Sequence, residues 1–368
     1  MVGRRRSRGT SLRLGFLGYR GEVNMDMTLT DEQELVRETV TRAARQLGNR
    51  TPDELLARRV CHADDWAVLA DLGFTGLPTS SEVVEGRGIM TAIVACALAA
   101  ELATVPFIGR SVMAAGLLSL AGADDLCEAV AMGELRATVL LDGSLTDVAD
   151  AVAGSVAADA LGASHAVAVR EVSGGVEIVL VDLDPTAVWS PDLTRPQASP
   201  RPGPGEVLGR VLCSELEQWR ASTLVACAAD AVGAMTAAFD LAVDYAKQRH
   251  QYGRAIGSFQ AIQHLLADQY VVIEGCRTAV NHAAWALDTL GGQAALRAAR
   301  IAKAATSAAG VQVAETVIQV HGGIGFTWEH SAHLYLRRVL LDRQLLGSEE
   351  IQYLRLGRMF LDQPGDTT

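Results

Sequence analysis

Two short stretches near the C-terminus decide how this sequence folds: RHQYGRAIGSFQ at residues 249–260 and QVHGGIGF at residues 319–326. The first places Arg249 at the end of a helical pattern, and a guanidinium is suited to bidentate contact with phosphate. The second ends an alanine-rich helical pattern in Gly322 and Gly323, where a ligand can approach the backbone closely. On local chemistry alone, a helix C-cap and a surface charge explain these residues equally well.

Around these stretches the chain divides into three blocks. Apolar residues make up 49% and charged residues 20% of its 368 residues, so the chain can bury a large core. Helical patterning fills residues 25–133, short β-type runs separated by turns fill 134–216, and helical patterning returns over 217–368. Segregated blocks predict an α+β fold with an N-terminal helical domain, a small middle β domain and a C-terminal helical bundle.

The folded part is expected to begin near residue 25. Residues 1–24 are rich in Arg and Gly and carry a single acid, so we expect a disordered extension or an over-long start, with Met25 or Met27 as the first residue. Thr30, followed three residues later by Gln33, predicts a capping box at the start of the first helix.

Charge and cysteine content argue against several classes of protein. The net charge of −11 is unlike that of a nucleic-acid-binding protein. The six cysteines form no CxxC pair and the histidines complete no ligand spacing, so no metal site is expected. No run of 18 apolar residues occurs, residues 90–100 being the nearest candidate, so no membrane span is expected. Scattered, unpaired cysteines favour a cytoplasmic protein.

Three stretches taken in order resemble the acyl-CoA dehydrogenase family: LTDEQ at 29–33, RHQYGRAIGSFQAIQHLLAD at 249–268 and QVHGGIGFTWEHSAHLYLRR at 319–338. The resemblance covers residues 25–362 and implies a helical domain, a β-barrel domain and a four-helix C-terminal bundle. Members of the family use FAD to remove two hydrogens from the α and β carbons of an acyl-CoA thioester. A carboxylate takes the α proton while flavin N5 takes the β hydride. The resemblance also implies an electron-transfer flavoprotein as electron acceptor.

The resemblance assigns cofactor contacts to particular residues of this chain. Arg249 and Gln260 match the family positions that hold the pyrophosphate and adenosine side of FAD. Gln319, Gly322 and Gly323 match the segment that touches the same part of the cofactor. In the family these groups reach FAD bound to a neighbouring subunit. Because all of them are present, we expect this chain to contact FAD.

The part of the family pattern that serves the flavin ring is missing. The family strand typically reads Thr-Glu-Pro before a Gly-Ser-Asp turn, whereas residues 139–147 read VLLDGSLTD, so we expect a shortened flavin loop. The usual positions of the catalytic base fall on Leu346 and Thr223, and neither side chain can remove a proton. The weak remaining candidate is Asp230 on the same helical face, for which a capping or core-polar role is the alternative.

This asymmetry favours a heteromer in which a homologous partner supplies the flavin pocket and the base. We expect a non-catalytic subunit of an α2β2 acyl-CoA dehydrogenase, of the kind associated with steroid side-chain degradation in actinobacteria. By that analogy the substrate is a steroid-derived or other lipid-derived acyl-CoA. Two alternatives stay open: a homomeric dehydrogenase with a relocated base, and a flavin-free acyl-CoA-binding or scaffolding protein.

Overall fold

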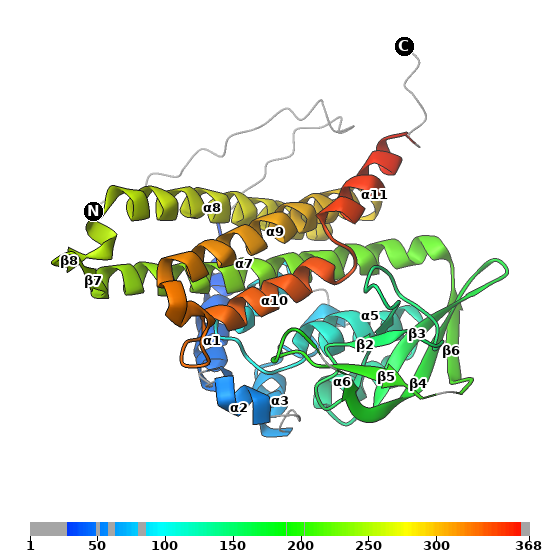
Figure 1. The fold of residues 1–368 in the computed structure, drawn as a ribbon. Coiled ribbons are helices and arrows are strands. Elements are labelled where there is room, and N and C mark those ends of the chain that lie inside the picture. Colours follow the sequence, from blue (N-terminus) through cyan, green and yellow to red (C-terminus); the bar gives the residue numbers. More distant parts are fainter. Residues whose placement is uncertain are drawn as a thin grey trace, which may run out of the picture.

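The computed structural model describes residues 28–48, 52–57, 63–79, 86–188, 190–201 and 203–361. The extension expected at residues 1–24 lies outside these ranges. Within them, helices are followed by strands and then by helices again, which confirms the expected α+β class (Figure 1).

The N-terminal helices begin with the capping box predicted from the sequence. Thr30 Oγ1 accepts a hydrogen bond from Gln33 N at 3.2 Å, and Gln33 Oε1 accepts one from Thr30 N at 3.1 Å, so this prediction is confirmed. The elements of this part are α1 (Asp31–Leu47), α2 (Pro52–Ala57), α3 (Ala63–Asp71), η2 (Leu77–Thr79), α4 (Arg87–Ala100), the π-helix η3 (Phe107–Ala114), α5 (Ala115–Leu120) and α6 (Asp124–Met132).

The middle strands form one sheet that closes on itself. Its strands are β1 (Ala137–Leu141), β2 (Val156–Ala158), β3 (His165–Val172), β4 (Gly175–Val188), β5 (Gln197–Pro200) and β6 (Glu206–Val211). They are arranged in the order β3-β1-β2-β5-β4-β6, and β3 also pairs with β4. This additional pairing completes a ring of five strands with β6 outside it on β4, as in a small barrel.

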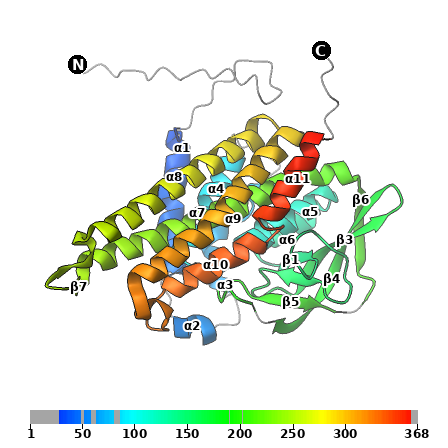
Figure 2. The same ribbon diagram turned by 45° about the horizontal axis from the view of Figure 1, so that its top comes forward.

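The C-terminal helices form a long bundle beside this β domain. The elements are η4 (Cys213–Glu215), α7 (Leu216–Gln248), β7 (His250–Gln251), β8 (Arg254–Ala255), η5 (Ile256–Ser258), α8 (Gln260–Thr289), α9 (Gly292–His321), η6 (Gly322–Phe326), α10 (Ala332–Gln344) and α11 (Glu349–Leu361). The β7–β8 hairpin joins α7 to α8 at the end of the bundle that lies away from the β domain (Figures 1 and 2).

Helix α7 is the centre of the molecule, and small side chains let its neighbours approach. A Cβ at Gly233 would overlap the carbonyl oxygen of Cys96 on α4, so the two backbones are nearly in contact there. Among the described residues one helix, Cys213–Gln248, is long and apolar enough to cross a membrane. The most apolar window of that helix is 72% buried inside the protein, as is typical of a core helix. From the sequence we expect no span, with residues 90–100 as the nearest candidate; the helix that is long and apolar enough is instead the one formed by η4 and α7.

We predict that Gly233→Ala destabilises the fold by about 1–3 kcal/mol, because the added methyl group forces α4 and α7 apart. The measurement is the free energy of unfolding in urea. Gly275→Ala is the matched control: it lies inside α8 with nothing within 4 Å of the new Cβ. We expect it to be neutral or to stabilise by up to about 1 kcal/mol through helix propensity. Equal effects of the two substitutions would contradict the close packing.

Candidate functional site

The residues expected to contact FAD lie together at the hairpin end of the bundle. Arg249 is the C-cap of α7, and its N–H donates to the carbonyl of Tyr245 at 2.8 Å. Gln260 is the first residue of α8, while Gln319, Gly322 and Gly323 lie at the end of α9. All five residues are exposed in the isolated chain.

Contacts between tilted rings hold the ends of α7 and α9 against each other. The ring of Tyr245 lies 4.5 Å from that of His321, which in turn lies 4.3 Å from the ring of His330. His321 Nδ1 is 2.8 Å from the carbonyl oxygen of Val317, and burial lowers the pKa of His321, so the ring packs as a neutral group. Beyond it the chain turns at Gly322 with φ of +65°, and a Cβ there would meet open space. The backbone at this glycine is therefore open to a ligand.

The positions expected for a catalytic base lie elsewhere, inside the protein. Leu346 occupies the turn between α10 and α11, is 3% exposed and packs in the main apolar core. Thr223 on α7 is fully buried, and its Oγ1 has no hydrogen-bond partner among the described residues. Asp230 is 1% exposed, and both of its oxygens accept hydrogen bonds at 2.7 Å from Arg338 on α10. Arg338 therefore holds both oxygens of the Asp230 carboxylate inside the protein.

Asp230 belongs to a cluster of buried charged side chains in the seam between the β domain and the helices. This seam cluster consists of Asp192, Arg195, Asp230, Arg338 and Asp342. Arg195 enters from the loop between β4 and β5 and donates to Asp192 at 2.7 Å and to Asp342 at 2.6 Å. Burial raises the pKa of Asp342, while the neighbouring guanidinium groups of Arg195 and Arg338 oppose this shift. The gap that Arg195, Asp230 and Arg338 border together with Asp159 admits no water-sized sphere.

A second set of contacts joins the β domain to the helices, between the loop after β1 and the turn before α11. Residues 142–147 follow β1, in the stretch where a shortened flavin loop is expected. Arg355 on α11 donates from Nη2 to the carbonyl of Thr146 at 3.1 Å and approaches the carbonyl of Leu346 with Nη1 at 3.4 Å. Asp147 in the same loop accepts from Arg355 at 3.2 Å and from Arg220 at 3.0 Å. One guanidinium therefore spans from the β1 loop to the turn that carries Leu346.

Buried Lys303 fixes the shape of that turn. Its ammonium donates to Ser307 at 2.8 Å and to the carbonyls of Arg343 and Gly347, both at 3.1 Å. Burial lowers the pKa of Lys303 to about 8. Sequence reasoning assigned no role to Lys303, although one signal was present: the chain has only two lysines among its 32 basic residues. A compact group with three donors fits where a planar guanidinium does not.

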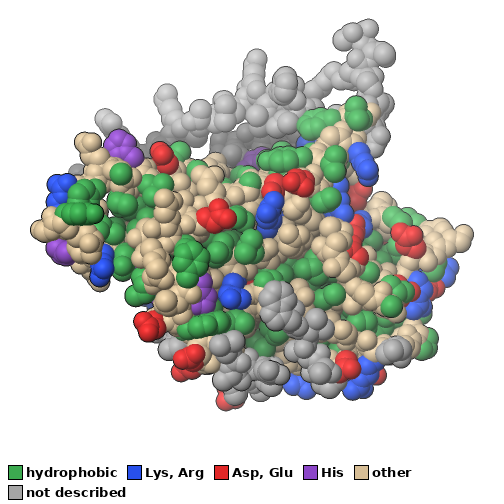
Figure 3. Space-filling model, in the orientation of Figure 1, with side chains coloured by type: hydrophobic (Ala, Val, Ile, Leu, Met, Phe, Trp, Pro, Cys, Tyr) green, Lys and Arg blue, Asp and Glu red, His purple; other side chains and the backbone are tan. Residues whose placement is uncertain are grey.

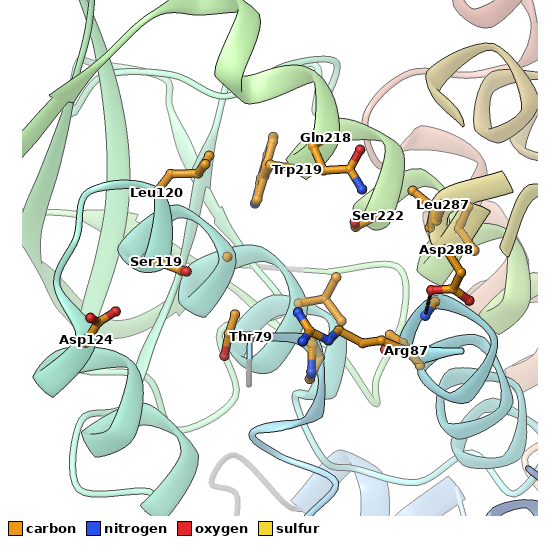
Figure 4. Close-up of a pocket in the computed structure, with 16 residues that line it drawn as sticks. Thr79, Arg87, Ser119, Leu120, Asp124, Gln218, Trp219, Ser222, Leu287 and Asp288 are labelled. Atoms are coloured by element: carbon orange, nitrogen blue, oxygen red, sulfur yellow. Dashed lines mark hydrogen bonds between the residues drawn. The ribbon is translucent and has the colours of Figure 1, made fainter. Parts of the chain in front are cut away.

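A separate cavity of about 450 Å³ lies on another face of α7, between α4, α5 and α8 (Figure 4). Arg87, Gln218, Trp219 and Ser222 face it, and none of the residues predicted to serve FAD or catalysis lines it. Asp288 at its edge accepts hydrogen bonds from the N-terminal amides of α4, at 2.7 Å from Gly88. This carboxylate is therefore occupied as a helix cap. No group of His, Cys, Asp or Glu side chains within the described ranges could hold a metal ion.

Comparison with known proteins assigns the family. Residues 216–361 match the model of the acyl-CoA dehydrogenase C-terminal domain. The chain is 31% identical over 339 residues to acyl-CoA dehydrogenase IpdE2 of Mycolicibacterium smegmatis, covering 89% of this chain and 98% of that protein. The chain therefore belongs to the acyl-CoA dehydrogenase family, as the sequence resemblance predicted.

Solved structures share its fold. A chain of the ChsE4–ChsE5 complex from Mycobacterium tuberculosis superimposes with a TM-score of 0.78 at 24% identity, covering 93% of this chain and all of that one. A chain of the Tcur3481–Tcur3483 steroid acyl-CoA dehydrogenase does so with a TM-score of 0.77 at 22% identity, covering 91% of this chain and 99% of that one. The expected architecture of N-terminal helices, a small β domain and a C-terminal bundle is thereby confirmed.

Asp159, which borders the same gap as Arg195 and Arg338, is a buried carboxyl group whose titration can be measured. Burial raises the pKa of Asp159 to about 6; one of its oxygens accepts from Gly109 N at 3.0 Å and the other has no partner among the described residues. A folded-state pKa above the unfolded value means that stability is lost as the pH rises from about 4 to about 6. We predict that Asp159→Asn removes this loss. The stability difference between variant and wild type then shifts by about 1–3 kcal/mol in favour of the variant between pH 4 and pH 7.

Chemical denaturation at both pH values tests this, with Asp125→Asn on the exposed start of α6 as the control, for which no such shift is expected. A variant that keeps the pH dependence of the wild type would show that Asp159 is not the group responsible.

Proposed function

We propose that this chain is the non-catalytic subunit of a heteromeric acyl-CoA dehydrogenase and that it contributes the ADP-side contacts to FAD held by a homologous partner chain. The observation that carries the proposal is Arg355, which reaches the β1 loop at Thr146 and the turn at Leu346 at the same time. When bound, FAD supplies the hydride acceptor for the dehydrogenation. The residues of this chain fit its ADP side and do not fit its flavin ring.

The way in which the β domain is joined to the helices speaks against a flavin ring in this chain. A flavin held by the β domain and reached by a base at position 346 or 223 has to lie between the β domain and α7 or α10. In this chain the seam cluster joins those elements through Arg195, and Arg355 joins them a second time at the edge. Opening the seam would expose buried charges that are paired only with one another, which is strongly unfavourable.

The hairpin end of the bundle, by contrast, exposes aromatic side chains to solvent. Tyr252, three residues after Arg249, is 92% exposed, and Phe326, three residues after Gly323, is 72% exposed. Hydrophobic side chains lie over this part of the bundle in Figure 3, beside basic and histidine side chains. Exposed aromatic residues around a basic group are typical of protein interfaces, and here they surround the expected FAD contacts.

The comparisons support the kind of partner and substrate. One structural neighbour is a two-protein complex by its name, ChsE4–ChsE5, and another is called a steroid acyl-CoA dehydrogenase of two proteins, Tcur3481–Tcur3483. We propose the same kind of assembly here, α2β2, with a steroid side-chain or other lipid-derived acyl-CoA as substrate and an electron-transfer flavoprotein as acceptor. A homomeric enzyme using Asp230 is less well supported, because Arg338 and Arg195 neutralise that carboxylate in the interior.

The test is the amount of flavin bound per chain. We predict that the tagged chain expressed alone purifies with little visible flavin absorbance. The same chain purified from its native host should bring with it a second member of the acyl-CoA dehydrogenase family and one FAD per pair of chains. A full FAD per chain from the single gene would overturn the proposal in favour of a homomeric enzyme. Absence of flavin from both preparations would favour the flavin-free alternative.

A further inference from the structure

We propose that a groove beside α7 binds an aliphatic chain carrying a carboxylate head group. The groove lies between α1, α4, α7 and α8 and has a volume of about 360 Å³, within the range of about 300–1,000 Å³ that is typical of ligand sites. It is separate from the seam: Ala229 and Val232 of α7 line the groove, whereas Asp230 between them faces α10. The proposal does not depend on the function proposed above.

The floor of the groove is apolar because of one stripe of α4. Ile89, Ile93, Ala97 and Ala100 recur at helical spacing, all line the groove and all are only half-buried. The close approach at Gly233 places the backbone of α7 directly beneath this stripe. Apolar surface in a concave site is unfavourable when it faces water and is favourable when an apolar ligand covers it. The floor therefore suits a hydrocarbon chain and offers no partner to the hydroxyl groups of a sugar.

The rim carries two arginines, each ion-paired with a glutamate of its own helix. Arg277 on α8 donates from Nε to Glu274 at 3.2 Å and from Nη2 to Thr236 on α7 at 3.3 Å. Those contacts orient the guanidinium, and Nη1 has no acceptor among the described residues. On the opposite rim Arg37 of α1 lines the groove while paired with Glu34 of the same helix.

A guanidinium held in place beside an apolar floor matches a carboxylate at the end of a hydrocarbon chain. Thr41 and Asn281 also line the groove, and their polar side chains suit a head group that stays in contact with water. The ligand class is therefore a fatty acid or another aliphatic carboxylate.

Titration calorimetry with dodecanoate, on the full chain, tests the site directly. We expect dodecanoate to bind, and dodecanol, which lacks the charge, to bind about tenfold more weakly. Arg277→Gln should weaken dodecanoate about tenfold and leave dodecanol unchanged. Arg210→Gln, a change of an exposed arginine on β6, is the matched control and should leave both affinities unchanged. Absence of dodecanoate binding, or equal binding by wild type and Arg277→Gln, would overturn the proposal.

A measurement without any substitution places the ligand. Cys96 lines the groove and is half-buried, whereas Cys213 is exposed and outside it. With a small thiol reagent and peptide mass spectrometry, we expect dodecanoate to slow modification of Cys96 at least fivefold and to leave Cys213 unaffected. Binding without protection of Cys96 would mean that the fatty acid occupies another part of the protein, and the proposal would then be wrong.

Discussion

Two guanidinium groups buried between the β domain and the helices are the constraint on which the rest of the structure depends. Arg195 and Arg338 are each almost completely removed from water, so every carboxylate that balances them has to be held within hydrogen-bonding distance. Those carboxylates come from the β4–β5 loop, from α7 and from α10. The position of the β domain on the bundle follows, because removing one member of such a cluster costs about 3–5 kcal/mol.

This constraint separates two regions of one fold. Near the β domain, the seam cluster and Arg355 tie the β4–β5 loop and the loop after β1 to the helices. At the far end of α7 and α9, the Tyr245–His321 contact keeps Arg249 beside an open glycine turn. In a homomer each chain would need both regions to be functional. A heteromer needs only one working region from each subunit, and for this reason the proposed assembly pairs this chain with a homologous partner.

Local signals in the sequence were sufficient for some features and not for others. The Thr30–Gln33 capping box depends on residues three apart, so the sequence predicted it correctly. The family motifs also gave the order of the domains. The pairing of Arg195 with Asp342 joins residues 147 apart, and no periodicity records such a contact. For the same reason the sequence left Asp230 open between a base and a core residue, and only the position of Arg338 settles its surroundings.

The most direct test of the shared-cofactor account is the affinity of the assembled complex for FAD when Arg249 of this chain alone is changed. We predict that Arg249→Ala weakens FAD binding at least about tenfold, since a charge-assisted contact to the pyrophosphate is lost. Arg358→Ala, on the exposed face of α11, should leave the affinity unchanged. The same FAD affinity in the wild-type and Arg249→Ala complexes would contradict the claim that the hairpin end of this chain contacts the FAD bound by its partner.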